Sequence, residues 1–345
     1  MTTLPVGEII SGRHDSEQVT LRGWLHQIRT GGGILFLQLR DGSGLIQCTL
    51  KKDLVDAKEF DRLSAIPVES TIQVSGTVRK DPRAPTGYEI AGDKVTVLYQ
   101  AQEGFPIARG KPEKFHGTDF LLDNRHFDIR SPKLVTIMRL RACLIQELRN
   151  WLIEHGYLEV HVPILVNAAV EGGSTLFEVK YFGEKAYLTQ SWQLYAEAMI
   201  SSVGKIFTLA PSFRAEKSRT IRHLTEYWHL EVEEPWLDLD GLMRMEEQLV
   251  SSACQKVRKK MPEELKLIGR ETKELETVEP PFPRLRYDEA VRLVQKAKPN
   301  FQWVRIWHGR KRRFSQRDST NRSLSVTFPR RSRHFITCLI RRTTK

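Results

Sequence analysis

The sequence predicts an α+β protein of two domains, a small five-stranded β-barrel followed by a larger domain in which helices flank an antiparallel sheet. Three observations lead to this prediction. Between Val19 and Tyr99, short runs alternate apolar and polar residues between Gly, Asp and Pro turns, as strands do. A helical period follows residue 131, and two alternating runs between Ile206 and Glu234 flank a charged loop. The length of 345 residues also exceeds that of a usual single domain.

The net charge of +12 comes from the end of the chain. Residues 296–345 contain 15 Lys or Arg and one acidic residue, Asp318, whereas the preceding residues contain 39 basic and 41 acidic ones. The total charge is therefore no argument for nucleic-acid binding, and RNA contacts have to be sought in particular residues.

The four cysteines lie far apart, without the spacing of a zinc site or a disulfide framework. The amino terminus lacks the pattern of a signal peptide, and no run of about eighteen apolar residues predicts a membrane span. We therefore expect a cytoplasmic protein with no membrane partner.

In the first domain, the run from Leu35 to Leu39 predicts which side chains face solvent. Period two directs the three leucines to the core and leaves Phe36, Gln38 and Arg40 on the outer side. An outward Phe beside polar and basic groups suits stacking on an RNA base, although a single surface aromatic on an ordinary barrel fits the pattern equally well.

The second domain is expected to begin after a linker that is rich in Gly and Pro. Ser131 and Pro132 supply an N-cap and a first helical position, and a helix of about twenty residues follows. Its helical spacing is carried by five apolar residues: Val135, Met138, Leu144, Leu148 and Leu152.

The segment from Ile206 to Glu234 predicts an antiparallel hairpin with one polar face. Thr208, Ser212, Arg214 and Glu216 fall on one side of the first strand. In the second strand, the same face collects Tyr227, His229, Glu231 and Glu233. On the pattern alone, this face could simply be solvated.

These segments resemble class II aminoacyl-tRNA synthetases of the aspartyl, asparaginyl and lysyl subgroup. The resemblance implies an OB-fold anticodon-binding domain at 1–100, a hinge at 101–130 and a class II catalytic domain at 131–295, followed by an aberrant tail at 296–345. The catalytic domain matches motif 1, a helix and strand that form a homodimer interface, and motif 2, the predicted hairpin.

The first domain carries the anticodon part of the resemblance, in the residues from Arg29 to Gln47. It implies that Phe36 stacks on the central anticodon base, that Gln47 reads the edge of this base, and that Arg29 lies on the anticodon backbone. The implied partner is tRNA(Asn).

Motif 2 carries the catalytic part of the resemblance. Activation brings the substrate carboxylate onto the α-phosphate of ATP, and a guanidinium such as that of Arg214 can stabilise both anions. The resemblance implies that Arg222 and His223 hold the γ-phosphate, that Tyr227 stacks on adenine, and that Glu216 lies near the adenine or the tRNA acceptor end. Mg²⁺ is expected with ATP, but the segment that supplies its acidic ligands in the family is missing.

The amino-acid pocket is expected to favour asparagine. The resemblance assigns Glu171 and Gln193 to the substrate ammonium. Aspartate enzymes have Lys at the position of Ala196, and here Glu197 follows instead, which can accept a bond from an amide but would leave the carboxylate of aspartate unpaired. Glu197 as a plain helix-surface residue is the alternative.

The implied function is asparagine–tRNA ligase activity, through asparaginyl-adenylate. The resemblance ends near Leu293 and motif 3 is absent, so we expect impaired activity. Alternatives are an aspartyl enzyme, an inactive tRNA-binding remnant, and a related asparagine synthetase, which would not need the barrel. The abrupt change of composition suggests a tail translated in the wrong reading frame, whereas a natural basic tail is the competing interpretation.

Overall fold

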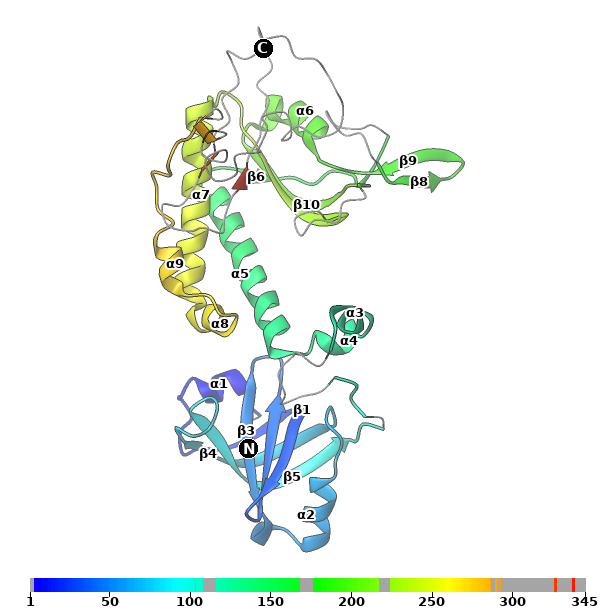
Figure 1. Cartoon of the computed structure of the whole chain (residues 1–345), viewed down its shortest axis with the longest axis vertical. Helices are drawn as coiled ribbons and strands as arrows, with labels where there is room; N and C mark the ends of the chain where they lie inside the picture. Colours follow the sequence, from blue (N-terminus) through cyan, green and yellow to red (C-terminus); the bar gives the residue numbers. More distant parts are fainter. Residues whose placement is uncertain are drawn as a thin grey trace. The chain divides into compact units, whose positions relative to one another are not determined.

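The computed structural model describes residues 3–102, 104–107, 116–167, 176–216, 224–286, 289–290 and 292, together with the backbone of two short paired strands, β12 (Val326–Thr327) and β13 (Thr337–Cys338). The chain divides into two compact units, Met1–Leu134 and Val135–Lys345, and most of their elements are labelled in Figure 1. The remainder of the basic tail lies outside the described residues. The structure therefore does not test the prediction that this tail is translated in the wrong reading frame.

The first unit is built on a closed five-stranded barrel with the order β1-β2-β3-β5-β4. Its strands are β1 (Gln18–Gly31), β2 (Ile34–Arg40), β3 (Leu45–Lys51), β4 (Thr71–Lys80) and β5 (Tyr88–Tyr99). Three short helical segments accompany them: α1 (Val6–Ile10), η1 (Lys52–Leu54) and α2 (Ala57–Ser64). The predicted five-stranded barrel is confirmed.

The alternation in β2 explains how this strand contributes to the apolar core inside the barrel. Leu35, Leu37 and Leu39 are completely buried, and the residues between them are only partly covered. Because side chains alternate across a strand, each apolar residue of this period adds to one interior cluster. Phe36 therefore lies on the outer side of the strand, as the sequence predicts.

The hinge contains structure that the sequence analysis missed. Two short helices, α3 (Thr118–Asp123) and α4 (Arg125–Asp128), occupy its second half. Just beyond them, Arg130 donates to the buried carboxylate of Glu69 at 2.5 Å, and Arg40 of β2 donates to the same oxygen at 3.0 Å. The guanidinium of Arg130 also lies over the ring of Phe127, with its central carbon 5.2 Å from the ring centroid. A long-range carboxylate thus fastens the hinge to the barrel of this unit.

Besides the two-stranded β12–β13 pair, the second unit contains two small sheets and five helices in its described residues. One sheet has the order β11-β10-β6 and the other β7-β9-β8. The strands are β6 (Leu158–Glu159), β7 (Leu165–Val166), β8 (Glu178–Tyr181), β9 (Glu184–Leu188), β10 (Ile206–Phe213) and β11 (Glu226–Glu233). The helices are α5 (Pro132–Glu154), α6 (Gln193–Val203), α7 (Leu239–Lys260), α8 (Pro262–Leu267) and α9 (Thr272–Glu276).

The expected long helix is α5, which begins at Pro132 with a 3.4 Å bond from the Leu134 amide to Ser131 Oγ. Its buried face differs from the expected one, because Met138 and Leu144 are exposed. The covered face instead includes Glu147, which is buried because Lys260 of α7 donates to it at 2.6 Å. A hydrophobic period cannot anticipate a buried acid of this kind.

The reverse face of the β10–β11 hairpin packs on α5. Phe207 of β10 is fully buried against Trp151 and Leu152, and Leu230 and Val232 of β11 join this cluster. Burying a large apolar side chain contributes about 1.5–3 kcal/mol, so this cluster holds the opposite, polar face of the hairpin in place.

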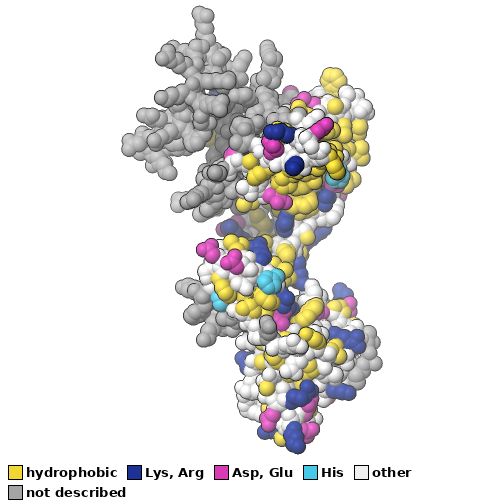
Figure 2. All heavy atoms as spheres, turned by 90° about the vertical axis from the view of Figure 1, so that its right-hand side faces the viewer, with side chains coloured by type: hydrophobic (Ala, Val, Ile, Leu, Met, Phe, Trp, Pro, Cys, Tyr) yellow, Lys and Arg dark blue, Asp and Glu magenta, His cyan; other side chains and the backbone are white. Residues whose placement is uncertain are grey.

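Several large apolar side chains of the second unit are exposed. Figure 2 shows hydrophobic side chains gathered on the face that carries the β8–β9 hairpin, whose tip residue Phe182 is 94% exposed. Within the described residues, no helix is both long and apolar enough to cross a membrane.

We expect Glu69→Gln to destabilise the first unit. Glutamine has no negative charge, so this change leaves the guanidinium groups of Arg40 and Arg130 without the counter-charge of Glu69. Breaking a buried ion pair costs about 3–5 kcal/mol of stability. Arg130 is partly exposed, so we expect about 2–3 kcal/mol from urea denaturation of the wild type and the variant.

Glu59→Gln is the matched control, because Glu59 pairs with Arg62 at 2.7 Å on an exposed surface, where an ion pair contributes about 0–1 kcal/mol. Equal losses in the two variants would show that the buried carboxylate has no special role.

Candidate functional site

The polar face of the hairpin is set by the register of β10 and β11. The strands are antiparallel, with Ser212 opposite Tyr227, Ala210 opposite His229, and Thr208 opposite Glu231. Directly opposed residues share a face of the sheet. Tyr227, His229 and Glu231 are therefore brought to one surface with Ser212, as the alternation predicts.

Arg214 follows directly after β10, and its backbone is fixed from both sides. The Phe213 amide donates to the Thr189 carbonyl at 2.9 Å, and the Arg214 amide donates to the Thr225 carbonyl at 2.9 Å. The exposed guanidinium lies over the ring of Tyr227, with its central carbon 5.8 Å from the centroid. Glu216 is exposed and has no hydrogen bond or ion pair with another described residue.

Glu231 connects the hairpin to the start of α6. Ser191 Oγ donates to one carboxylate oxygen, and the Trp192 amide lies 3.4 Å from the other. Burial raises the pKa of this carboxyl, because removing it from water disfavours its charged form. The sequence analysis placed Glu231 on the polar face but named no role for it; the alternating pattern was the only signal.

His229 lies between Ser212 and Glu231. Its Nδ1 is 3.2 Å from Ser212 Oγ and 3.3 Å from Glu231 Oε2. Burial, and secondly the nearby charge of Arg214, lower the pKa of His229 to about 4. The imidazole is therefore neutral at pH 7, and its approach to Glu231 is not an ion pair between two full charges.

Two predicted pocket residues meet on α6. Gln193 Nε2 donates to Glu197 Oε1 at 2.9 Å, in agreement with their expected position one turn apart. Glu197 is exposed, whereas Ala196 is fully buried against Trp192 and Ile206. A lysine at position 196 would therefore place its stem among apolar side chains, so a change there tests folding as well as specificity.

Three predicted site residues, Glu171, Arg222 and His223, lie outside the described residues. In the part that the structure describes, no group of three or more His, Cys, Asp or Glu residues could hold a metal ion.

The three predicted residues of the barrel form one connected group. Arg29 of β1 is directly opposite Phe36 of β2, and its guanidinium carbon is 4.8 Å from the centroid of the Phe36 ring. Arg29 Nη2 donates to Gln47 Oε1 at 3.2 Å, and Gln47 Nε2 donates to Glu89 Oε2 at 3.0 Å. Phe36 and Arg29 can form a stacking surface, whereas Gln47 is buried beside them and its amide is held by Arg29 and Glu89. Glu89 was missed, because its pairing with β3 depends on barrel closure.

Two family profiles match the chain. The profile described as tRNA synthetases class II (D, K and N) matches residues 117–337, and the one described as OB-fold nucleic acid binding domain matches residues 19–98. The first match extends beyond residue 295 into the basic tail. The frameshift hypothesis for that tail stays a prediction.

Curated relatives that share one name are similar to most of the chain. Asparagine--tRNA ligases from Thermoplasma acidophilum and Pyrococcus abyssi are 43% and 45% identical, each over 84% of this chain and 66% of the relative. The chain thus spans slightly less than two thirds of the length of these relatives.

Among solved structures, asparaginyl-tRNA synthetase from Pyrococcus horikoshii complexed with asparaginyl-adenylate matches with a TM-score of 0.78 and 43% identity, over 84% of this chain and 66% of that one. Aspartyl tRNA synthetase from Entamoeba histolytica matches at 25% identity, over 86% of this chain and 63% of that one, with a TM-score of 0.68.

We expect His229 to make the folded state more sensitive to acid. The unfolded chain takes up a proton on His229 near its ordinary pKa of about 6.5, and the folded protein only near about 4. Stability is therefore unaffected by this group above pH 7 and falls as the pH decreases from about 6.5 to about 4. Melting temperatures at pH 7 and pH 4.5 measure the loss, which should be smaller in His229→Gln.

His161→Gln changes an exposed histidine and is expected to keep the wild-type difference between the two pH values. If His229→Gln keeps it as well, the buried imidazole is not responsible for the acid sensitivity.

Proposed function

The chain belongs to the class II tRNA synthetases of the D, K and N type, and on this premise we propose that it is an asparagine–tRNA ligase. The reaction activates asparagine with ATP to asparaginyl-adenylate and transfers the asparaginyl group to tRNA(Asn). The observation that carries the proposal is the polar hairpin face, where Arg214, Tyr227 and Glu231 lie beside the start of α6.

In the proposed first step, the asparagine carboxylate attacks the α-phosphorus of ATP and pyrophosphate leaves. Arg214 is assigned to the asparagine carboxylate and the α-phosphate. A planar guanidinium can bond to carboxylate and phosphate oxygens together and stabilise the charge that develops between them. Tyr227 is assigned to adenine, and its position under the Arg214 guanidinium supports this. Arg222 and His223 are proposed for the γ-phosphate, and Glu216 for the adenine or the acceptor end.

We assign the amino acid to Gln193, Glu197 and Glu171, with asparagine preferred over aspartate. The bond between Gln193 and Glu197 supports a shared site on α6. Glu197 can accept a hydrogen bond from an amide group, whereas the carboxylate of aspartate would be repelled there and left unpaired. An aspartyl enzyme remains the runner-up within the family.

The barrel is assigned to the anticodon of tRNA(Asn). Phe36 would stack on a base while Gln47 bonds to its edge, and Arg29 would contact the backbone. The closed barrel and the grouping of these residues support the assignment. They equally support a second candidate function, a tRNA-binding protein without activation activity.

We further propose a homodimer that forms along α5. Four of its apolar side chains, Ile137, Met138, Leu144 and Ile153, are between 39% and 57% exposed, which favours a covered state. Mg²⁺ is proposed only as a companion of ATP, since the described residues offer it no cluster of ligands.

The exchange of radioactive pyrophosphate into ATP tests activation. We expect asparagine to support exchange above the aspartate control, and Arg214→Ala to abolish it, because one group that stabilises the developing charge contributes a factor of about 10²–10³. Exchange with aspartate alone would favour the aspartyl enzyme, and no exchange with either would favour the tRNA-binding remnant.

Filter binding with tRNA(Asn) tests the barrel. Stacking on a base contributes about 1–3 kcal/mol, so Phe36→Ala should weaken binding by roughly 5- to 150-fold without unfolding the barrel. Trp24→Ala, which removes another partly exposed aromatic of the barrel, is the control and should bind as the wild type does. Unchanged affinity in both Phe36→Ala and Gln47→Ala contradicts the anticodon assignment.

A further inference from the structure

The loop between β11 and α7 holds one tryptophan entirely in solvent. Trp236 is fully exposed and has a φ of +64°, a left-handed conformation that is unfavourable for a residue with a side chain. Leaving an indole in water forgoes the burial energy of one of the largest apolar side chains. Both features disfavour this arrangement unless the indole has a partner.

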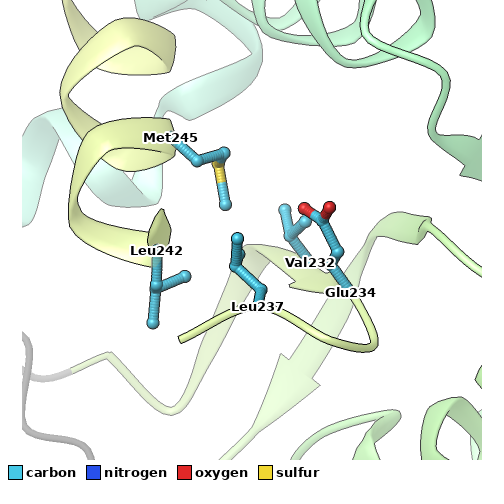
Figure 3. Close-up of a pocket in the computed structure, with 5 residues that line it drawn as sticks. All are labelled: Val232, Glu234, Leu237, Leu242 and Met245. Carbon is cyan, nitrogen blue, oxygen red and sulfur yellow. The ribbon is translucent and has the colours of Figure 1, made fainter. Parts of the chain in front are cut away.

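The next residue explains why Trp236 points outward. Leu237 turns inward toward Met245, beside Val232 and Leu242, as Figure 3 shows. Gly241 makes room for this packing, since a Cβ there would lie 2.6 Å from Leu237 Cδ1 and would push that side chain aside. Anchoring of Leu237 against α7 therefore leaves its neighbour Trp236 on the outer side.

A cavity of about 300 Å³ adjoins the same loop, and Glu234 and Leu237 form part of its wall. Its other walls include Trp151 and His155, whose rings stack with centroids 3.8 Å apart. This volume is at the lower end of the range of small-molecule pockets, about 300–1,000 Å³, and suits a single aromatic side chain.

The cavity also has the charges that suit an indole. Lys205 and Arg244 line it, and Arg244 is exposed and has no ion pair with another described residue. Cations over an aromatic face attract its π electrons, most strongly for Trp. Lys205 forms an ion pair with Glu234 at 2.6 Å. Glu234 also accepts a hydrogen bond from the Tyr157 hydroxyl, and these two bonds hold the side chains on this wall of the cavity in place.

We propose that Trp236 inserts into this cavity on a second copy of the chain. The inference rests on the homodimer proposed above and goes beyond it by naming the side chain and the cavity that join the two copies. A knob and a socket within one short loop are self-complementary, so a two-fold axis beside residue 236 would satisfy both at once.

A second copy accounts for more than an unrelated ligand would. A small ligand in the cavity would leave Trp236 in water, whereas a second copy covers the indole and fills the cavity in the same contact. Tryptophan is one of the residues that are enriched at the hot spots of protein interfaces.

Sedimentation equilibrium of the full chain tests the proposal. Because each dimer contains two such contacts, we expect Trp236→Ala to raise the dimer dissociation constant by about a hundredfold or more, and Trp236→Phe to raise it less. Phe182→Ala is the matched control, since it removes another almost fully exposed aromatic of this unit and should leave the dissociation constant unchanged.

Cross-linking identifies the socket. In a background in which Cys143, Cys254 and Cys338 are changed to serine, a mixture of Trp236→Cys and His155→Cys chains with a short bis-maleimide should form a covalent dimer. The background protein alone and the His155→Cys chain alone should form none. A dimer unaffected by Trp236→Ala, or without this cross-link, overturns the inference and leaves the homodimer intact. A chain that stays monomeric overturns both, and the exchange assay tests the ligase proposal independently of either result.

Discussion

The antiparallel register between β10 and β11 is the constraint on which the candidate site depends. It opposes Ser212 to Tyr227 and Thr208 to Glu231, and on the reverse face it opposes Phe207 to Val232. A slip of one residue would exchange the two faces, burying the charged groups against α5 and exposing the apolar ones. The apolar cluster on Trp151 and Leu152 therefore holds the register as well as the core.

This arrangement also explains why two titratable groups of the polar face are partly buried. Glu231 and His229 are partly removed from water. Burial raises the pKa of Glu231 and lowers the pKa of His229, so it favours the neutral form of both groups. Ser191 offsets part of that cost for Glu231 by donating a hydrogen bond. In the proposed reaction, Arg214 would meet the anions with an exposed guanidinium, beside groups that fixed hydrogen bonds hold in place.

The elements of this fold with a clear local period could be predicted from the sequence. Leu35, Leu37 and Leu39 mark the barrel core, and the alternation around Ser212 and His229 marks the polar face. Each of these patterns depends only on neighbours within a strand.

Contacts between distant segments could not be predicted in this way. The carboxylate of Glu69 joins Arg40 and Arg130 across 29 and 61 positions of sequence, and Glu147 is buried by a lysine 113 positions away. Glu231 belongs to the same group, since its partner Ser191 lies 40 positions earlier. The residues that position the site are therefore found only when its elements are assembled.

The bonds of Gln47 in the barrel have a consequence for the energetics of recognition. Its amide oxygen is already engaged by Arg29 and its amide nitrogen by Glu89. Each of these atoms can form a second hydrogen bond, so the two partners leave one lone pair and one N–H of the amide for a ligand and hold the amide in one orientation. Under the proposed anticodon assignment, a base would meet a donor and an acceptor whose order is already fixed. A base edge with the opposite order could bond only after the amide had turned and both original bonds had broken, which would disfavour the wrong base.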